Sequence, residues 1–292
     1  MAVDAPAEGL QFNDLVLQTV RPEDDALRRR VASVERRLGK KRFLEEACAL
    51  AERGTSGEPA LAAMLGVKCR RKGEAVVALN DEKAEVAVEI PDGTTEISNG
   101  AFDSCCSVTS VLMTDSVTKV GLGAFAGCFQ LKRIAIPDAV IEMHNKAFMN
   151  CSSLTSLTMP SRLTKIGDSL FFGCSSLADI RLPETLTMIG QYAFCGCSSL
   201  ASLTIPDSVT AIGKCAFRSC SSLTSIRLPQ SLSTIGEEAF RDCKSLRSVV
   251  IPDSVQRIER GAFEDCTGLT SLSLPKQLCF RGVPRGCTVV RR

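Results

Sequence analysis

The chain has 292 residues, of which 45% are hydrophobic and 23% are charged, and its formal net charge is +2. A net charge this close to zero argues against a protein that binds nucleic acid over its whole surface. No stretch approaches the ~18 consecutive apolar residues of a membrane-spanning helix, and the first residues lack the basic and apolar regions of a secretory signal. We therefore expect a cytoplasmic protein whose 15 cysteines are reduced.

Residues 1–66 are predicted to form an arm followed by a basic amphipathic helix. Pro22 suits the first turn of a helix, and the acidic residues at 23–25 follow where the positive end of the helix dipole favours them. Leu27, Val31 and Val34 then fall on one helical face. The opposite surface is basic, with eight side chains: Arg28, Arg29, Arg30, Arg36, Arg37, Lys40, Lys41 and Arg42.

This basic surface has two interpretations. It is either the solvated side of a helix that covers the first repeat described below, or a contact for an acidic partner, a nucleic acid or an anionic membrane. The solvated face is the simpler interpretation, because runs of charge are usually just solvated. Nucleic-acid or membrane binding is expected only through this helix.

A unit of 23 residues repeats eight times over residues 91–274, and residues 67–90 form a degenerate capping repeat before it. Every unit carries a phenylalanine and a cysteine in fixed register. The phenylalanines are at 102, 125, 148, 171, 194, 217, 240 and 263, and the cysteines at 105, 128, 151, 174, 197, 220, 243 and 266. The constant register means that no insertion interrupts the stack of repeats.

Within a unit, the apolar residues predict two extended segments. In "LTSLTMP", Leu157 and Met159 point inward from a short strand that Pro160 ends. Leu163 and Ile166 point inward from a second segment, and the glycine that follows in most units marks a backbone turn that a side chain would obstruct. After 278 the pattern fails, so residues 275–292 are predicted to form a polar C-terminal cap.

The segment "IPDSVTAIGKCAFRSCSSLTSIRLP" resembles the BspA-like leucine-rich repeat, and the resemblance covers about residues 86–280. It implies a mainly β repeat solenoid, with a parallel sheet and a second, shorter extended layer on the opposite side; the fold class also includes the N-terminal α-helical segment. Members of this family occur as bacterial surface adhesins and as intracellular proteins of microbial eukaryotes.

The eight register cysteines are predicted to form a structural column in which each thiol is a small buried group and a weak hydrogen-bond donor. Stacked thiols do not converge tetrahedrally, the repeats contain no CxxC pair and the chain has one histidine, His144, so no metal or cofactor is expected. From residue 91 onward, five further cysteines lie outside this register, and some of them should be exposed and reactive: Cys106, Cys195, Cys215, Cys279 and Cys287.

The outward positions of the longer strand are the candidate partner-binding residues, because solenoids commonly bind through such surfaces. We single out Arg133, Asp179, Arg181, Ser202, Ser225, Arg227 and Ser248. The function predicted is a non-enzymatic protein-binding scaffold, and the alternatives are an extracellular adhesin-like ligand binder and attachment through the basic helix. A merely solvated sheet also fits, because this surface lacks the tryptophan and tyrosine that dominate binding hot spots. The sequence names neither the partner nor the oligomeric state.

Overall fold

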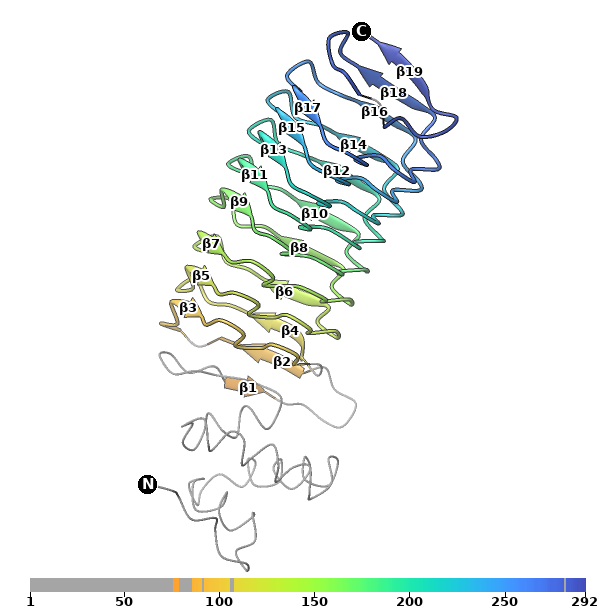
Figure 1. Cartoon of the computed structure of the whole chain (residues 1–292). Coiled ribbons are helices and arrows are strands. Elements are labelled where there is room, and N and C mark those ends of the chain that lie inside the picture. The colour runs from red at the N-terminus through yellow and green to blue at the C-terminus, as the bar shows by residue number, and fades with distance from the viewer. Residues whose placement is uncertain (1–75, 79–85, 91, 106–107, 281) are drawn as a thin grey trace, which may run out of the picture. The chain divides into compact units, whose positions relative to one another are not determined.

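The structure, a computed structural model, describes residues 76–78, 86–90, 92–105, 108–280 and 282–292. All of these belong to one compact unit, Lys72–Arg292. The described elements are strands joined by turns, and each 23-residue repeat makes one rung of a solenoid (Figure 1). The fold class predicted for the repeats is confirmed, whereas the predicted N-terminal arm and basic helix lie outside the described residues.

One stack of strands contains the longer strand of each rung. Its members are β2 (Val86–Glu89), β4 (Val108–Leu112), β6 (Arg133–Ala135), β8 (Ser156–Thr158), β10 (Asp179–Arg181), β12 (Ser202–Thr204), β14 (Ser225–Arg227), β16 (Ser248–Val250), β18 (Ser271–Leu274) and β19 (Thr288–Arg291). Paired strands in this stack are parallel. β1 (Val76–Ala78) pairs antiparallel with β2, so this end of the stack is a hairpin and not a further rung.

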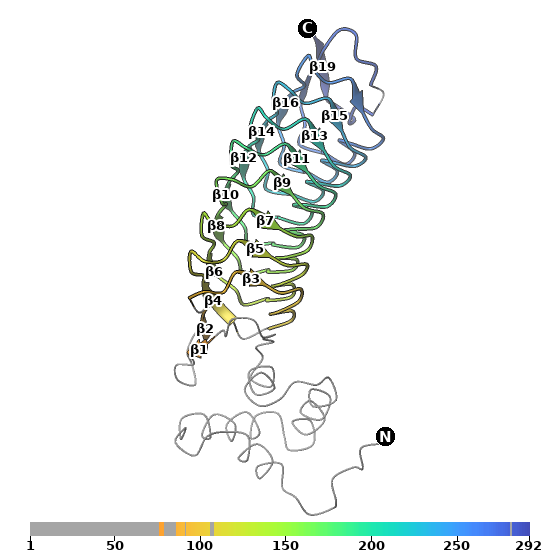
Figure 2. The same ribbon diagram turned by 90° about the vertical axis from the view of Figure 1, so that its left-hand side faces the viewer.

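A second stack of two-residue strands runs along the opposite side of the solenoid, as Figures 1 and 2 show together. Its members are β3 (Glu96–Ile97), β5 (Lys119–Val120), β7 (Glu142–Met143), β9 (Lys165–Ile166), β11 (Met188–Ile189), β13 (Ala211–Ile212), β15 (Thr234–Ile235) and β17 (Arg257–Ile258). This is the shorter layer that the resemblance implied, and its paired strands are also parallel.

The space between the two stacks is filled by columns of identical side chains. The eight register phenylalanines are at most 2% exposed. Their rings lie nearly parallel, with neighbouring centroids 4.9 to 5.8 Å apart. The phenylalanine column is therefore part of the core, and it joins each rung only to its neighbours.

A glycine follows most short strands because the backbone of the preceding rung lies too close to leave room for a side chain. A Cβ built on Gly213 would lie 2.7 Å from the carbonyl carbon of Gly190, and one on Gly236 would lie 2.6 Å from that of Gly213. The predicted obstruction is therefore real, and it comes from the backbone of the preceding rung. His144 and Glu259 occupy the same place in their rungs.

The last rung of the solenoid is shortened. Ser248 pairs with Ser271, 23 positions later, but Ser271 pairs with Thr288, only 17 positions later. Two arginines hold this end: Arg291 donates to the carbonyl oxygens of Lys276 and Leu278, at 3.1 and 3.0 Å, and Arg292 donates to that of Ile251 at 2.6 Å. Because six positions are missing, the final connection cannot follow the full path of the other rungs.

Candidate functional site

The seven predicted partner-binding residues all lie on the outward side of the long stack. Each strand from β6 to β16 shows the same pattern, with an exposed residue on either side of a buried one. The exposed residues of these strands are here called the sheet face: Arg133, Ala135, Ser156, Thr158, Asp179, Arg181, Ser202, Thr204, Ser225, Arg227, Ser248 and Val250. The strand register aligns them in rows, as in Ser202 with Ser225 and Thr204 with Arg227.

Many serine and threonine hydroxyls outside the sheet face join neighbouring rungs. The Oγ1 of Thr187 donates to the carbonyl oxygen of Thr164 at 3.0 Å, and the Oγ of Ser233 donates to that of Thr210 at 2.9 Å. By contrast, among the described residues the hydroxyls of Ser202, Ser225 and their sheet-face equivalents have no hydrogen-bond partner within the chain. The sheet face therefore presents unused hydrogen-bonding groups to the solvent.

The charged residues of the sheet face are not equivalent. Nη2 of Arg227 lies 2.8 Å from Oδ2 of Asp207, which follows the neighbouring strand β12. The backbone N–H of Gln230 and this guanidinium lower the pKa of Asp207. Arg181 and Asp179 form no ion pair within the described part of the chain, so they are the charges that the centre of the sheet face offers to a partner.

The long strands form ladders in pairs, β8 with β10, β12 with β14 and β16 with β18. In each pair the second strand comes from the unit that ends in "LP", following a unit that ends in "MP" or "IP". From β8 to β18 the alternation of these units therefore coincides with this pairing, while β18 also pairs with β19; the second strands of the first two pairs carry Arg181 and Arg227.

The register cysteines form a column of inter-rung hydrogen bonds. Each thiol from Cys128 to Cys266 donates to the carbonyl oxygen of the phenylalanine 26 positions earlier, at 2.9 to 3.2 Å. Burial raises the pKa of both Cys174 and Cys266 to about 12. A raised pKa disfavours the reactive thiolate. These thiols are structural donors, as the sequence predicted.

The cysteines outside the register divide into two groups, apart from Cys106, which lies outside the described residues. Cys279 is exposed and Cys287 is half-buried, so the prediction that some would be exposed is confirmed for this end of the chain. Cys195 and Cys215 are not among the exposed ones, because both are buried. Burial raises the pKa of Cys195 to about 11, with the neighbouring Cys215 adding to the effect.

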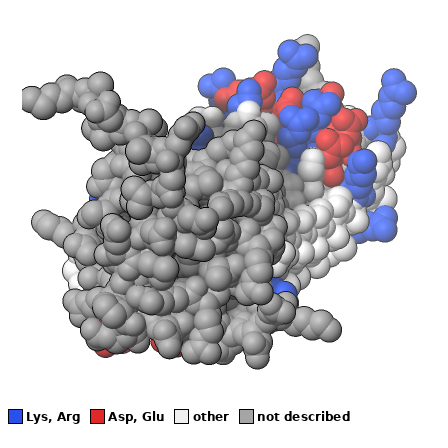
Figure 3. Space-filling model, turned by 90° about the horizontal axis from the view of Figure 1, so that it is seen from below, with Lys and Arg blue, Asp and Glu red and all other residues white. Residues whose placement is uncertain are grey.

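An ion-pair cluster that the sequence did not predict lies on the turns between the short and long strands. Arg241 contacts Glu238 at 3.0 Å, Glu264 at 2.9 Å and Asp265 at 3.2 Å, and Arg218 contacts Glu238 at 2.7 Å. Figure 3 shows acidic and basic side chains lying side by side along one edge of the solenoid. The partners are 3 to 24 positions apart, so only the stacking of rungs brings most of them together.

The described residues contain no group of three or more histidine, cysteine, aspartate or glutamate side chains placed to hold a metal ion. They also contain no helix that is long and apolar enough to cross a membrane. His144 is exposed, with Nε2 3.4 Å from Oε2 of Glu142.

Comparisons with known proteins agree with this geometry. The family described as "BspA type Leucine rich repeat region" matches residues 83–201 and 187–281, in six copies. A leucine-rich repeat protein from T. pallidum is 30% identical over 59% of this chain and 87% of its own, with a TM-score of 0.50. One from Bacteroides ovatus is 23% identical over 76% of each chain, with a TM-score of 0.51, and shows likeness of fold alone. No curated protein matches the sequence.

Proposed function

This chain belongs to the BspA-type leucine-rich repeat family, and we propose that it is a non-enzymatic scaffold that binds a protein partner through the sheet face. The observation that carries the proposal is the contrast between two sets of hydroxyl groups. Many of those on the turns and beside the short strands hydrogen-bond to the preceding rung, as Thr187 does, whereas those on the sheet face have no hydrogen-bond partner among the described residues. Unbonded hydroxyls in rows can exchange solvent for a partner's hydrogen bonds at little cost in desolvation.

The charges of the sheet face would orient such a partner. Asp179 and Arg181 are the first and last residues of β10 and both face outward, so they offer an anion and a cation two positions apart on the same face. Arg227 is held by Asp207 at 2.8 Å and is less available for a new contact. Exposed apolar side chains flank this region, since Leu112 and Val250 are each 55% exposed. A partner that covers the sheet face would therefore meet a polar centre between two apolar ends.

A reducing compartment is part of the proposal. Its support is that the twelve described cysteines are free thiols and that seven of them serve as hydrogen-bond donors between rungs. Counting free thiols on protein isolated from its native source tests this compartment. Extensive disulfide formation there would contradict it and would favour the extracellular, adhesin-like alternative.

The test of the binding surface uses the full-length chain with a photo-crosslinking residue at Ser225. We expect a specific protein to be captured in cells, and we expect its capture to be abolished when Ser202→Arg places a bulky charge beside the crosslinker. Met188→Arg is the matched control, because Met188 is 44% exposed on the opposite, short stack. This control should leave capture unchanged.

Two results would overturn the assignment of the sheet face. One is equal loss of the captured protein in both arginine variants, which would show that capture does not depend on this surface. The other is retention of the chain on RNA or heparin that is lost when residues Arg28 to Arg42 are neutralised, together with no capture from Ser225. That result would favour attachment through the predicted basic helix.

A further inference from the structure

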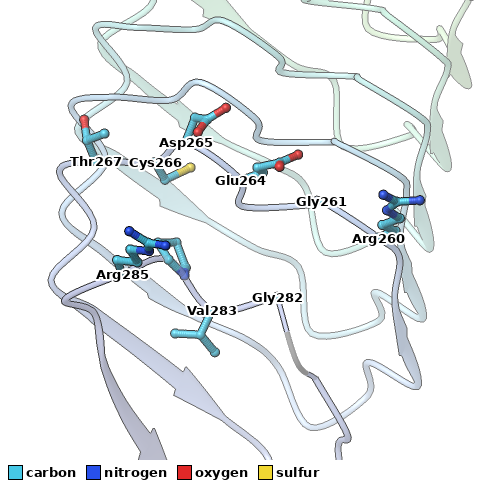
Figure 4. A pocket seen from close by; sticks show the side chains of 10 residues that line it. Arg260, Gly261, Glu264, Asp265, Cys266, Thr267, Gly282, Val283 and Arg285 are labelled. Atoms are coloured by element: carbon cyan, nitrogen blue, oxygen red, sulfur yellow. The ribbon is translucent and has the colours of Figure 1, made fainter.

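A pocket of about 530 Å³ lies at the C-terminal end of the solenoid. One wall is the last complete turn, residues 260–267, and the other is the shortened segment at 282–285. Figure 4 shows the two walls facing each other, with Arg260 and Arg285 at opposite ends of the pocket. Its volume is in the range of sites that hold small molecules.

Three backbone N–H groups of the last complete turn lack the acceptors that their equivalents have. In the preceding rung, the N–H groups of Glu238, Phe240 and Asp242 donate to carbonyl oxygens of the next rung at 3.0, 2.8 and 3.0 Å. All seven rungs from 100 to 242 repeat this three-bond pattern. The corresponding groups are those of Gly261, Phe263 and Asp265, and among the described residues none of these three has an acceptor.

The shortened final connection explains why these donors are left over. A complete rung would place carbonyl oxygens opposite them, but the chain reaches β19 only 17 positions after its partner in β18. Phe280 instead packs edge-on against Phe263, with ring centroids 6.1 Å apart. Residues 282–285 already form the wall opposite these donors. The pocket between the two walls therefore suits a small ligand better than another turn of chain.

The backbone around the pocket has the geometry of an anion-binding concavity. Gly261 and Asp265 have φ values of 68° and 57°, in the left-handed region. Successive N–H groups of turns that combine right- and left-handed residues form concavities that bind anions. Both Gly261 and Asp265 line the pocket, so their N–H groups have access to it.

The charges of the lining also favour an anion. The carboxylates of Glu264 and Asp265 are already held by Arg241, at 2.9 and 3.2 Å. Arg260 and Arg285 form no ion pair with any described residue, so their guanidinium groups remain available to a ligand. Guanidinium groups bind phosphate oxygens through short, charge-assisted hydrogen bonds.

From these observations we propose that the pocket binds a compact oxyanion of the phosphate class. In a complete rung the N–H groups of Gly261 and Asp265 would donate to the next rung. Here they donate to the anion, whose oxygens replace the missing carbonyl oxygens. Arg260 and Arg285 neutralise its charge from the two ends. This site lies at the end of the solenoid and is independent of the sheet face.

The test is a titration of the full-length, isotope-labelled chain with inorganic phosphate, followed by amide NMR signals at constant ionic strength. We expect saturable shifts of the Gly261, Phe263 and Asp265 amides. The amides of Glu238, Phe240 and Asp242 are internal controls, because they already have acceptors and should not shift. A second arm with glycerol 3-phosphate shows whether a phosphate ester binds more tightly than free phosphate.

Variants separate the site from general charge effects. Arg285→Gln and Arg260→Gln should each weaken phosphate binding at least about tenfold, because each removes a charged hydrogen-bond donor. Arg162→Gln, a matched change at an exposed arginine elsewhere on the solenoid, should leave binding unchanged. Shifts that chloride reproduces, or equal binding by all three variants, would overturn the proposal. Two glutamine variants guard against misfolding of either one.

Discussion

The thiol of Cys220 donates a hydrogen bond to the carbonyl oxygen of Phe194, 3.2 Å away in the preceding rung. The same oxygen accepts the backbone N–H of Cys197 at 3.1 Å. The thiol therefore satisfies the second lone pair of a buried carbonyl group, which explains why this position is a cysteine and not an alanine. Repeated through the stack, this bond joins neighbouring rungs along a line inside the core.

Replacing Cys220 by alanine should lower the free energy of unfolding by about 1–2 kcal/mol, because a buried hydrogen bond and the volume of a sulfur atom are lost together. Urea unfolding followed by circular dichroism measures the change. Cys279→Ala, at an exposed thiol, should stay within about 0.5 kcal/mol of the parent protein. Equal values for the two variants would contradict a stabilising role for the thiol column.

Phe217→Ala should be more damaging, with a loss of about 3–5 kcal/mol, because it opens a cavity in the core. The ring of Phe217 is fully buried and stacks between those of Phe194 and Phe240, at 5.4 and 5.3 Å. Phe129→Ala is the matched control, since Phe129 is 46% exposed and should cost less than about 1 kcal/mol. Unfolding experiments on both variants decide the matter, and a small loss at Phe217 would disprove the packing.

The thiol column predicts that the protein loses stability at alkaline pH. An unfolded thiol titrates near its ordinary pKa of 9.0, whereas burial raises the pKa of Cys174 to about 12 in the folded chain. Between these values the unfolded state has released a proton that the folded state keeps, so a rise in pH favours unfolding. The stabilisation that comes from the protonated thiol of Cys174 is complete below pH 9 and is lost progressively as pH rises toward 12.

Urea unfolding at pH 8 to about 10.5 checks this dependence. We expect the decline to be less steep in Cys174→Ala, which removes one of the titrating thiols. An identical slope in the parent protein and the variant would mean that Cys174 does not titrate with a raised pKa.

Gly213→Ala should destabilise the solenoid by about 1–3 kcal/mol, because the added methyl group has no room to move away from a backbone. Its Cβ would lie 2.7 Å from the carbonyl carbon of Gly190 and 2.8 Å from the nitrogen of Gln191. His144→Ala is the control at the same place in another rung, where a side chain is already accommodated. Thermal unfolding of both variants should show a lower midpoint only for Gly213→Ala.

The repeat pattern predicted most of the fold because each unit carries its own inward and outward positions. Phe217, Cys220 and Ile226 could be placed in the core from their register alone, and each of them is buried. The left-handed turn residues could not be predicted in this way. At the place of Cys215, all eight rungs have a positive φ, but only Gly100, Gly123 and Gly261 carry the residue that usually signals it.

The sequence by itself therefore determined the number of rungs, the two extended segments of each rung and the residues of the sheet face. Only the tertiary structure decided which polar groups remain free, because their partners are about one rung away in the chain. Among the described residues the hydroxyl of Ser225 has no hydrogen-bond partner, while Ser233 donates to Thr210, although both are serines and lie in neighbouring units. The N–H of Gly261 likewise has no acceptor within the described part of the chain, because the next rung is shortened, and no local pattern around Gly261 records that difference.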